Sequence, residues 1–346
     1  MTNARLPVKT AAAAQDPAKI ATSDHTWAKS AAPRAAPRNA YIVGVVLGIS
    51  GAILFSTRAI LIKLAYAYQV DPVTFLTLRM VFSLPFFIVA AWWAQRSATA
   101  RAAPLDRRDI WSIIGLGLLG YYFASYVDFV ALQSISAVLA RLIQFLNPTL
   151  TILIMALFFA RRVVRREVMA LALCYAGIAL CLMHDVRLSG SLAVTASGAA
   201  LSFLSTLCYS LYLIFSNQLI TRMGSIRFTA YAMTVSSIAV IIHFLIANAW
   251  STLDLPWQVY AYGVVMALFC TVLPVFMVSE ANRRIGPAEV GILTSVGPVA
   301  TLLLGFILLG EIITLDQLAG VALVLAGVWF LSQKPKLSAE SNASKG

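Results

Sequence analysis

The stretch NPTLTILIMALFFARR, residues 147–162, decides the fold because a second version of its pattern occurs later in the chain. GPVATLLLGFILLGEI, residues 297–312, aligns with it and places Pro148 on Pro298, an offset of 150. Two further matches keep nearly the same offset: ILFST (53–57) with SFLST (202–206), and ALALCYAGI (170–178) with GVALVLAGV (320–328). Three landmarks in the same order predict an internal repeat.

The composition is that of a chain that lies mostly within a lipid bilayer. Of its 346 residues, 60% are hydrophobic and only 12% are charged, and the mean hydropathy is +0.84. A soluble domain carries roughly a quarter charged residues. The composition therefore excludes an ordinary soluble domain and predicts an integral membrane protein.

Ten apolar stretches are long enough to cross a bilayer, which needs about 20 residues in a helix. Backbone groups in lipid must be satisfied within the segment, so the spans are expected to be helices. The sequence predicts an all-α protein of two five-helix repeats, residues 40–185 and 192–333. Because five is odd, the second repeat is inverted. The expected spans are 41–65, 72–94, 110–132, 134–159, 167–184, 193–218, 228–249, 257–279, 286–309 and 315–332.

The net charge of +12 follows from where the basic residues lie. By our count, 21 of the 26 lysines and arginines precede the first span, follow the last, or lie between spans two and three, four and five, six and seven, or eight and nine. The positive-inside rule then places both termini in the cytoplasm, with residues 1–39 and 334–346 as tails, the first disordered. The charge therefore requires no nucleic-acid partner.

These features resemble the drug/metabolite transporter superfamily, and within it the EamA-type ten-helix group. The resemblance rests on the five-plus-five layout, the paired prolines, LLGE at 308–311, and GYYFASYVDFVALQSISAVLARLIQFLNPTL at 120–150. It covers about residues 42–333 and implies a multi-pass transporter of the bacterial inner membrane. Two positions depart from the pattern. Arg161 follows span four where members often have an acid, and Ala140 precedes Arg141 where one branch often has a glutamate.

Span four carries polar residues on one face. Arg141, Gln144 and Pro148 follow helical steps of three or four, and Asn147 lies at the edge of that face. Pro148 lacks an N–H and frees the carbonyl of Gln144, which is tolerated where the backbone lines a cavity. We expect a polar wall facing the bundle interior, with Pro148 and Pro298 as kink or gating positions.

Other spans carry charges at a similar depth. Arg58, Arg79 and Asp128 fall in the outer halves of spans one, two and three. Asp128 can neutralise only one arginine, so the remaining positive charge suits a carboxylate or phosphate. The candidate substrate-binding residues are Arg58, Arg79, Tyr121, Ser125, Asp128, Arg141, Gln144, Asn147 and Tyr209.

Each charge also has a structural interpretation, because intramembrane ionisable groups need partners. Asp128 and Arg141 could form an ion pair, and Arg79 could tie the first three spans together. Asp128, or with less support Glu289, could instead carry a proton for coupled transport.

The sequence lacks a G-x-x-x-x-G-K-[ST] loop, a zinc motif and a histidine cluster, so no ATP engine of that type, no cofactor, no metal and no enzyme activity are expected. It favours a secondary transporter, an exporter of anionic or zwitterionic metabolites such as amino acids. The alternatives are a cationic drug exporter, a channel, or a membrane sensor or enzyme. The expected partners are a small-molecule substrate and the bilayer, and a homodimer remains open.

Overall fold

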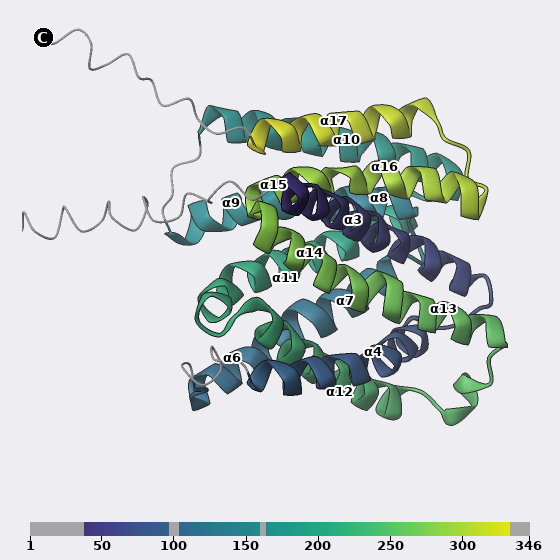
Figure 1. The fold of residues 1–346 in the computed structure, drawn as a ribbon. Helices are drawn as coiled ribbons and strands as arrows, with labels where there is room; N and C mark the ends of the chain where they lie inside the picture. The colour runs from purple at the N-terminus through teal and green to yellow at the C-terminus, as the bar shows by residue number, and fades with distance from the viewer. Residues whose placement is uncertain (1–37, 97–103, 160–163, 333–346) are drawn as a thin grey trace, which may run out of the picture.

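The computed structural model describes residues 38–96, 104–159 and 164–332. The expected tails up to residue 37 and from residue 333, and the departure at Arg161, lie outside these residues. Within them every regular element is a helix (Figure 1). Nine helical segments are long and apolar enough to span a membrane, and a shorter apolar helix over Leu315–Leu331 makes ten. The predicted all-α, ten-helix fold is confirmed.

The first repeat contains five spans, three of them continuous. The third span changes to π-helix in its middle, and the fourth breaks between α8 and α9. The elements are α3 (Arg38–Tyr66), α4 (Pro72–Gln95), α6 (Arg107–Gly117), η1 (Leu118–Phe123), α7 (Ala124–Ala131), α8 (Ala137–Gln144), α9 (Asn147–Phe159) and α10 (Arg165–Ser189).

The second repeat is interrupted at the corresponding places. Its π-helix η3 begins at Leu268, 150 residues after η1 begins at Leu118, and its ninth span also breaks before a proline. The elements are α11 (Leu192–Met223), α12 (Ser225–Ala247), η2 (Trp250–Leu253), α13 (Trp257–Ala267), η3 (Leu268–Val272), α14 (Leu273–Ile285), α15 (Pro287–Leu293), η4 (Thr294–Val296), α16 (Gly297–Leu304), η5 (Gly305–Leu309) and α17 (Leu315–Ser332).

The repeats pack through matching helices. Figure 1 shows α10 beside α17 and α4 beside α12, which pair span five with ten and span two with seven. The contact between α3 and α14 pairs span one with span eight, and the contact between α11 and α7 pairs span six with span three. Spans one and six are repeat counterparts, and so are spans three and eight, so these two contacts are equivalent. This pairing has the form of a pseudo-two-fold arrangement, as expected for inverted repeats.

Small residues hold α10 and α17 together. A Cβ added to Gly177 would lie 2.5 Å from the carbonyl oxygen of Gly320, and one added to Gly320 would lie 2.5 Å from Cys181 Sγ. Glycine is therefore required for these backbones to approach, a common form of helix packing in membranes.

The two ends of the bundle differ in packing. We call the end at which α3 begins and α17 ends the terminal end, and the opposite one the far end (Figure 1). At the far end, the turn before α8 and the first residues of α8 are tightly packed, and Ile135 and Leu139 are fully buried. The counterpart at the terminal end is α15, where Ile285 just before it and Val290 are buried but Gly291 and Ile292 are exposed.

Candidate functional site

Asp128 is the centre of a buried polar cluster. Its Oδ2 pairs with Arg58 Nη2 at 2.7 Å, and its Oδ1 accepts a hydrogen bond from Gln144 Nε2 at 2.8 Å. The Asp128 side chain is only 1% exposed, and Ser125 is buried one turn earlier on α7. A donor therefore occupies each oxygen, and the carboxylate is fixed between α3 and α8.

Arg141 extends from α8 toward the other repeat. Its Nη1 donates a long hydrogen bond of 3.4 Å to Gln144 Oε1, while its buried Nε has no partner. A Cβ added to Gly297 would lie 2.7 Å from Arg141 Nη2 and 3.1 Å from Ser56 Oγ. The guanidinium therefore lies against the bare backbone at the start of α16, where span nine breaks.

Arg79 is the most buried arginine of the cluster. Its side chain lies in α4 at 3% exposure, its guanidinium carbon is 5.2 Å from the Phe129 ring centroid, and its Nε has no partner. It lies within electrostatic reach of Arg58 and Asp128. Among the described residues, the cluster thus holds three arginines around one carboxylate, Asp128. Unbalanced charge of this kind is costly in a membrane protein and marks a functional site by default.

Aromatic and amide groups adjoin this cluster. The Tyr212 hydroxyl donates to that of Tyr121 at 3.1 Å, and the Tyr209 ring stacks on Tyr212 with centroids 5.5 Å apart. Tyr209 lies within electrostatic reach of Arg58 and Arg141. Ser210 Oγ donates to Asn147 Oδ1 at 2.8 Å, which joins α11 to the start of α9.

The two prolines occupy equivalent positions, each the second residue of the helix that follows a break. Pro148 follows the turn at Phe145 and Leu146, and Pro298 follows the 3₁₀ segment η4. At the first break, Leu146 N–H donates to the Ile143 carbonyl at 3.0 Å, an i to i−3 bond that replaces the α-helical pattern.

Glu289 lies apart from the other candidates. It is in the first turn of α15 at the terminal end, where its side chain is exposed and forms a hydrogen bond with Tyr41. The structure places it in a different region from the arginine cluster.

The structure pairs Asp128 with Arg58 at 2.7 Å, whereas the structural interpretation of the sequence was an ion pair between Asp128 and Arg141.

Sequence reasoning also missed Ser56, Ser210 and Gly297. Only Gly297 had a usable signal: it is the repeat counterpart of Asn147 and directly precedes Pro298. The serines give no pattern, because their roles depend on contacts between helices far apart in the chain.

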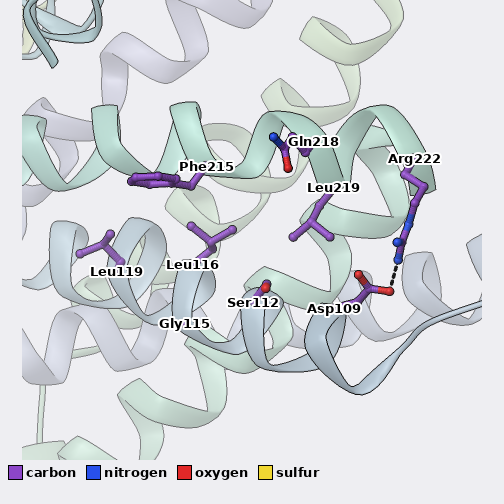
Figure 2. Close-up of a pocket in the computed structure, with 9 residues that line it drawn as sticks. All are labelled: Asp109, Ser112, Gly115, Leu116, Leu119, Phe215, Gln218, Leu219 and Arg222. Carbon is purple, nitrogen blue, oxygen red and sulfur yellow. Dashed lines mark hydrogen bonds and ion pairs between the residues drawn. The ribbon is translucent and has the colours of Figure 1, made fainter. Parts of the chain in front are cut away.

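A cavity of about 580 Å³ lies elsewhere, between α6 and α11 (Figure 2). Its walls come from the first half of span three and the second half of span six. None of the predicted substrate-binding residues lines it.

A family model described as the EamA-like transporter family matches residues 42–183 and 196–333, one match for each repeat. The chain is also similar to curated transporters. It is 27% identical over 299 residues to the uncharacterized transporter YcbK of Bacillus subtilis (strain 168), covering 83% of this chain and 91% of that protein.

A second relative is the threonine/homoserine exporter RhtA of Escherichia coli (strain K12), 28% identical over 235 residues, which cover 68% of this chain and 72% of RhtA. One solved crystal structure matches 83% of this chain and 96% of its own, with a TM-score of 0.59 and 16% sequence identity. That likeness shows the fold alone.

Proposed function

The chain belongs to the EamA-like transporter family, and we propose that it is a secondary active exporter of small organic metabolites that carry a carboxylate. The substrate is an anion or a zwitterion such as an amino acid. The similarity to a threonine/homoserine exporter supports export and this class of solute. The proposal places the protein in the bacterial inner membrane, with both termini in the cytoplasm, as the distribution of basic residues predicts.

The single observation that carries the proposal is the state of Arg141. Its side chain is partly exposed, its Nε has no partner, and Asp128 already pairs with Arg58. Arginine binds carboxylates through two parallel N–H donors, so a substrate carboxylate would complete the charge balance. Asn147 and Tyr209 are suited to contact the rest of such a molecule.

Alternating access is supported by the unequal ends of the bundle. Ile135 and Leu139 are sealed at the far end, whereas Gly291 and Ile292 are exposed at the terminal end. We infer a conformation open toward the cytoplasm, with substrate reaching Arg141 from the terminal end. Inverted repeats can exchange these two arrangements by rocking around a central site.

A proton gradient or solute exchange would supply the energy. Because Asp128 accepts from both Arg58 and Gln144, we assign it first the role of counter-ion. Proton coupling through Asp128 remains a second hypothesis. If Asp128→Asn transports at the normal rate with unchanged pH dependence, the coupling hypothesis fails while the exporter proposal stands.

The experiment is a thermal-stability screen of the purified full chain in detergent, followed by flux in proteoliposomes. The panel contains a dicarboxylate, neutral amino acids and organic cations. A ligand at 100 to 1,000 times its Kd stabilises the folded state by about 3–4 kcal/mol. We expect a carboxylate ligand to stabilise the wild type and Arg141→Lys to weaken this effect, because lysine cannot bind through two parallel donors.

Arg141→Ala should abolish the ligand effect, and Arg187→Ala is the matched control. Arg187 also carries an ion pair, to Asp316 at 2.8 Å, but its side chain is 66% exposed at the far end. Stabilisation by cations alone, retained in Arg141→Ala, would overturn the proposal and favour a cationic drug exporter.

A further inference from the structure

A slot between α6 and α11 is closed at both ends and open in the middle. A Cβ added to Gly120 would lie 2.3 Å from the Tyr212 ring, so the two spans touch there. At the terminal end, an ion pair between Arg222 and Asp109 joins them again. Between these contacts the helices leave the cavity of about 580 Å³, with Gly115 on its wall (Figure 2).

The walls of the slot change from polar to apolar along its length. Figure 2 shows the Asp109–Arg222 pair at one end and Phe215 facing Leu116 and Leu119 toward the other. Ser112, Gln218 and the apolar Leu219 lie between them. An amphiphile with a polar head at the terminal end and an apolar chain matches this order.

The α6 wall of the slot has bulkier counterparts in the second repeat. At the offset of 150, Ser112 corresponds to Tyr262 and Gly115 to Val265. The Tyr262 ring contacts the Tyr68 ring just after α3, with centroids 6.2 Å apart. The slot is therefore a feature of this chain's first repeat and does not follow from the repeat fold alone.

The polar end lies where α6 begins and α11 ends, and exposed arginines are found there together with the exposed Asp106. Arg107 and Arg108 are exposed in the first turn of α6, and Arg222 is exposed at the end of α11. Asp109 is buried beneath Arg222 and is the only acidic residue that lines the slot among the described residues. Basic pockets between helices on the cytoplasmic side of a membrane bind anionic lipid headgroups.

We propose that this slot binds a glycerophospholipid with an anionic headgroup. The acyl chain lies along Leu116, Leu119 and Phe215, and the phosphate lies beside the arginines at the terminal end. Figure 2 shows Leu119, Phe215, Leu116 and Arg222 in that order along the two helices. The proposal is independent of the identity of the transported solute.

Gly115→Leu tests the site in the full-length protein. A Cβ added at this position meets no atom within 4 Å, so a larger side chain can leave the backbone here, and leucine is expected to occupy the slot. Thermal stability and native mass spectrometry are measured with phosphatidylglycerol and with phosphatidylcholine of the same acyl chains. The wild type should retain phosphatidylglycerol and melt at a higher temperature with it, and Gly115→Leu should lose both effects.

Gly291→Leu is the matched control, because Gly291 is a second helical glycine whose added Cβ meets nothing within 4 Å. It should retain the selective effect. The headgroup is tested with Arg107→Gln/Arg108→Gln, which leaves the Asp109–Arg222 pair intact and should reduce selectivity for the anionic lipid. Glycerol phosphate, the soluble headgroup alone, should give no shift, because it lacks the acyl chain.

Three results would overturn the proposal. Gly115→Leu could retain as much phosphatidylglycerol as the wild type, or phosphatidylcholine could stabilise the wild type equally well. A shift with glycerol phosphate alone would indicate a site for soluble phosphate. Transport activity enters none of these outcomes, so failure here leaves the exporter proposal untouched.

Discussion

Spans four and nine are counterparts in the two repeats, and both break just before a proline. Beyond this shared shape they differ in chemistry. Span four carries Arg141, whose counterpart in span nine is Gly291. At the breaks, Asn147 of span four corresponds to Gly297, and Gly297 is the residue on which the Arg141 guanidinium lies.

The difference indicates how a duplicated fold can form a single asymmetric site. One repeat supplies the charge, and the other supplies the space for it at the equivalent break. Ser210, from the second repeat, likewise bonds Asn147 of the first at 2.8 Å. Substitutions at paired positions should therefore have unequal effects.

The largest difference in the loss of stability is expected between Asp128 and its repeat counterpart Val278. Asp128→Ala leaves the partly buried Arg58 without a carboxylate, so the free energy of unfolding should fall by up to about 3 kcal/mol, the lower end of the range for a fully buried pair. Val278→Ala removes two methyl groups beside Gly51 and should cost about 1–2 kcal/mol.

Thermal unfolding of the purified variants measures both effects. The double variant Arg58→Leu/Asp128→Leu should recover part of the loss, because Arg58 is then no longer left without its partner. Equal losses at the two positions would contradict the idea that the buried charge at this position matters in the first repeat and has no equivalent in the second.

The next difference is between two of the glycines of span nine, Gly297 and Gly291. Gly297→Val places side-chain atoms where the Arg141 guanidinium and Ser56 lie, which should destabilise the protein by about 1–3 kcal/mol and reduce transport. Gly291→Ala meets no atom and should stabilise α15 by about 0.5–1 kcal/mol.

Flux in proteoliposomes, with unfolding in parallel, measures this pair. If Gly297→Val transported at the wild-type rate, the contact between the Arg141 guanidinium and α16 would have no role in transport.

The smallest effect concerns the segment that follows span nine. Burial raises the pKa of the Glu311 carboxyl above its ordinary value of 4.5, and the Lys63 ammonium offsets part of this increase. A raised folded-state pKa adds stability below the unfolded-state pKa, and this contribution is lost as the pH rises through the folded-state value.

The wild type should therefore lose stability as the pH increases above about 4.5. Glu311→Gln should reduce this dependence, and unfolding measured across a pH series tests it. Other groups near the carboxyl, Asp185 and His184, are unchanged in this variant. An identical pH profile in the variant would show that Glu311 is not the group responsible.

Most of the fold could be predicted from the sequence. Ten apolar stretches, each long enough to cross lipid, leave little choice but helices, and the offset between Pro148 and Pro298 indicates the repeat. The candidate residues for the polar site were also visible, because an arginine in an apolar span is costly and conspicuous.

The partners of those residues could not be predicted. Depth along a span places Arg58, Arg141 and Asp128 at similar levels, but depth does not fix the rotation of each helix about its axis. Only the packed bundle selects Arg58 as the partner of Asp128 and leaves the Arg141 Nε without one.

By itself, the sequence determined that the chain lies in a lipid bilayer, how many spans it has and that they form a repeat, because hydrophobicity and periodicity are local properties of the chain. The tertiary structure decided the pairing of charges, the role of Gly297 and the slot beside Gly115. These features depend on distances between residues about 70 to 160 positions apart in the chain, which it acquires only when its helices pack.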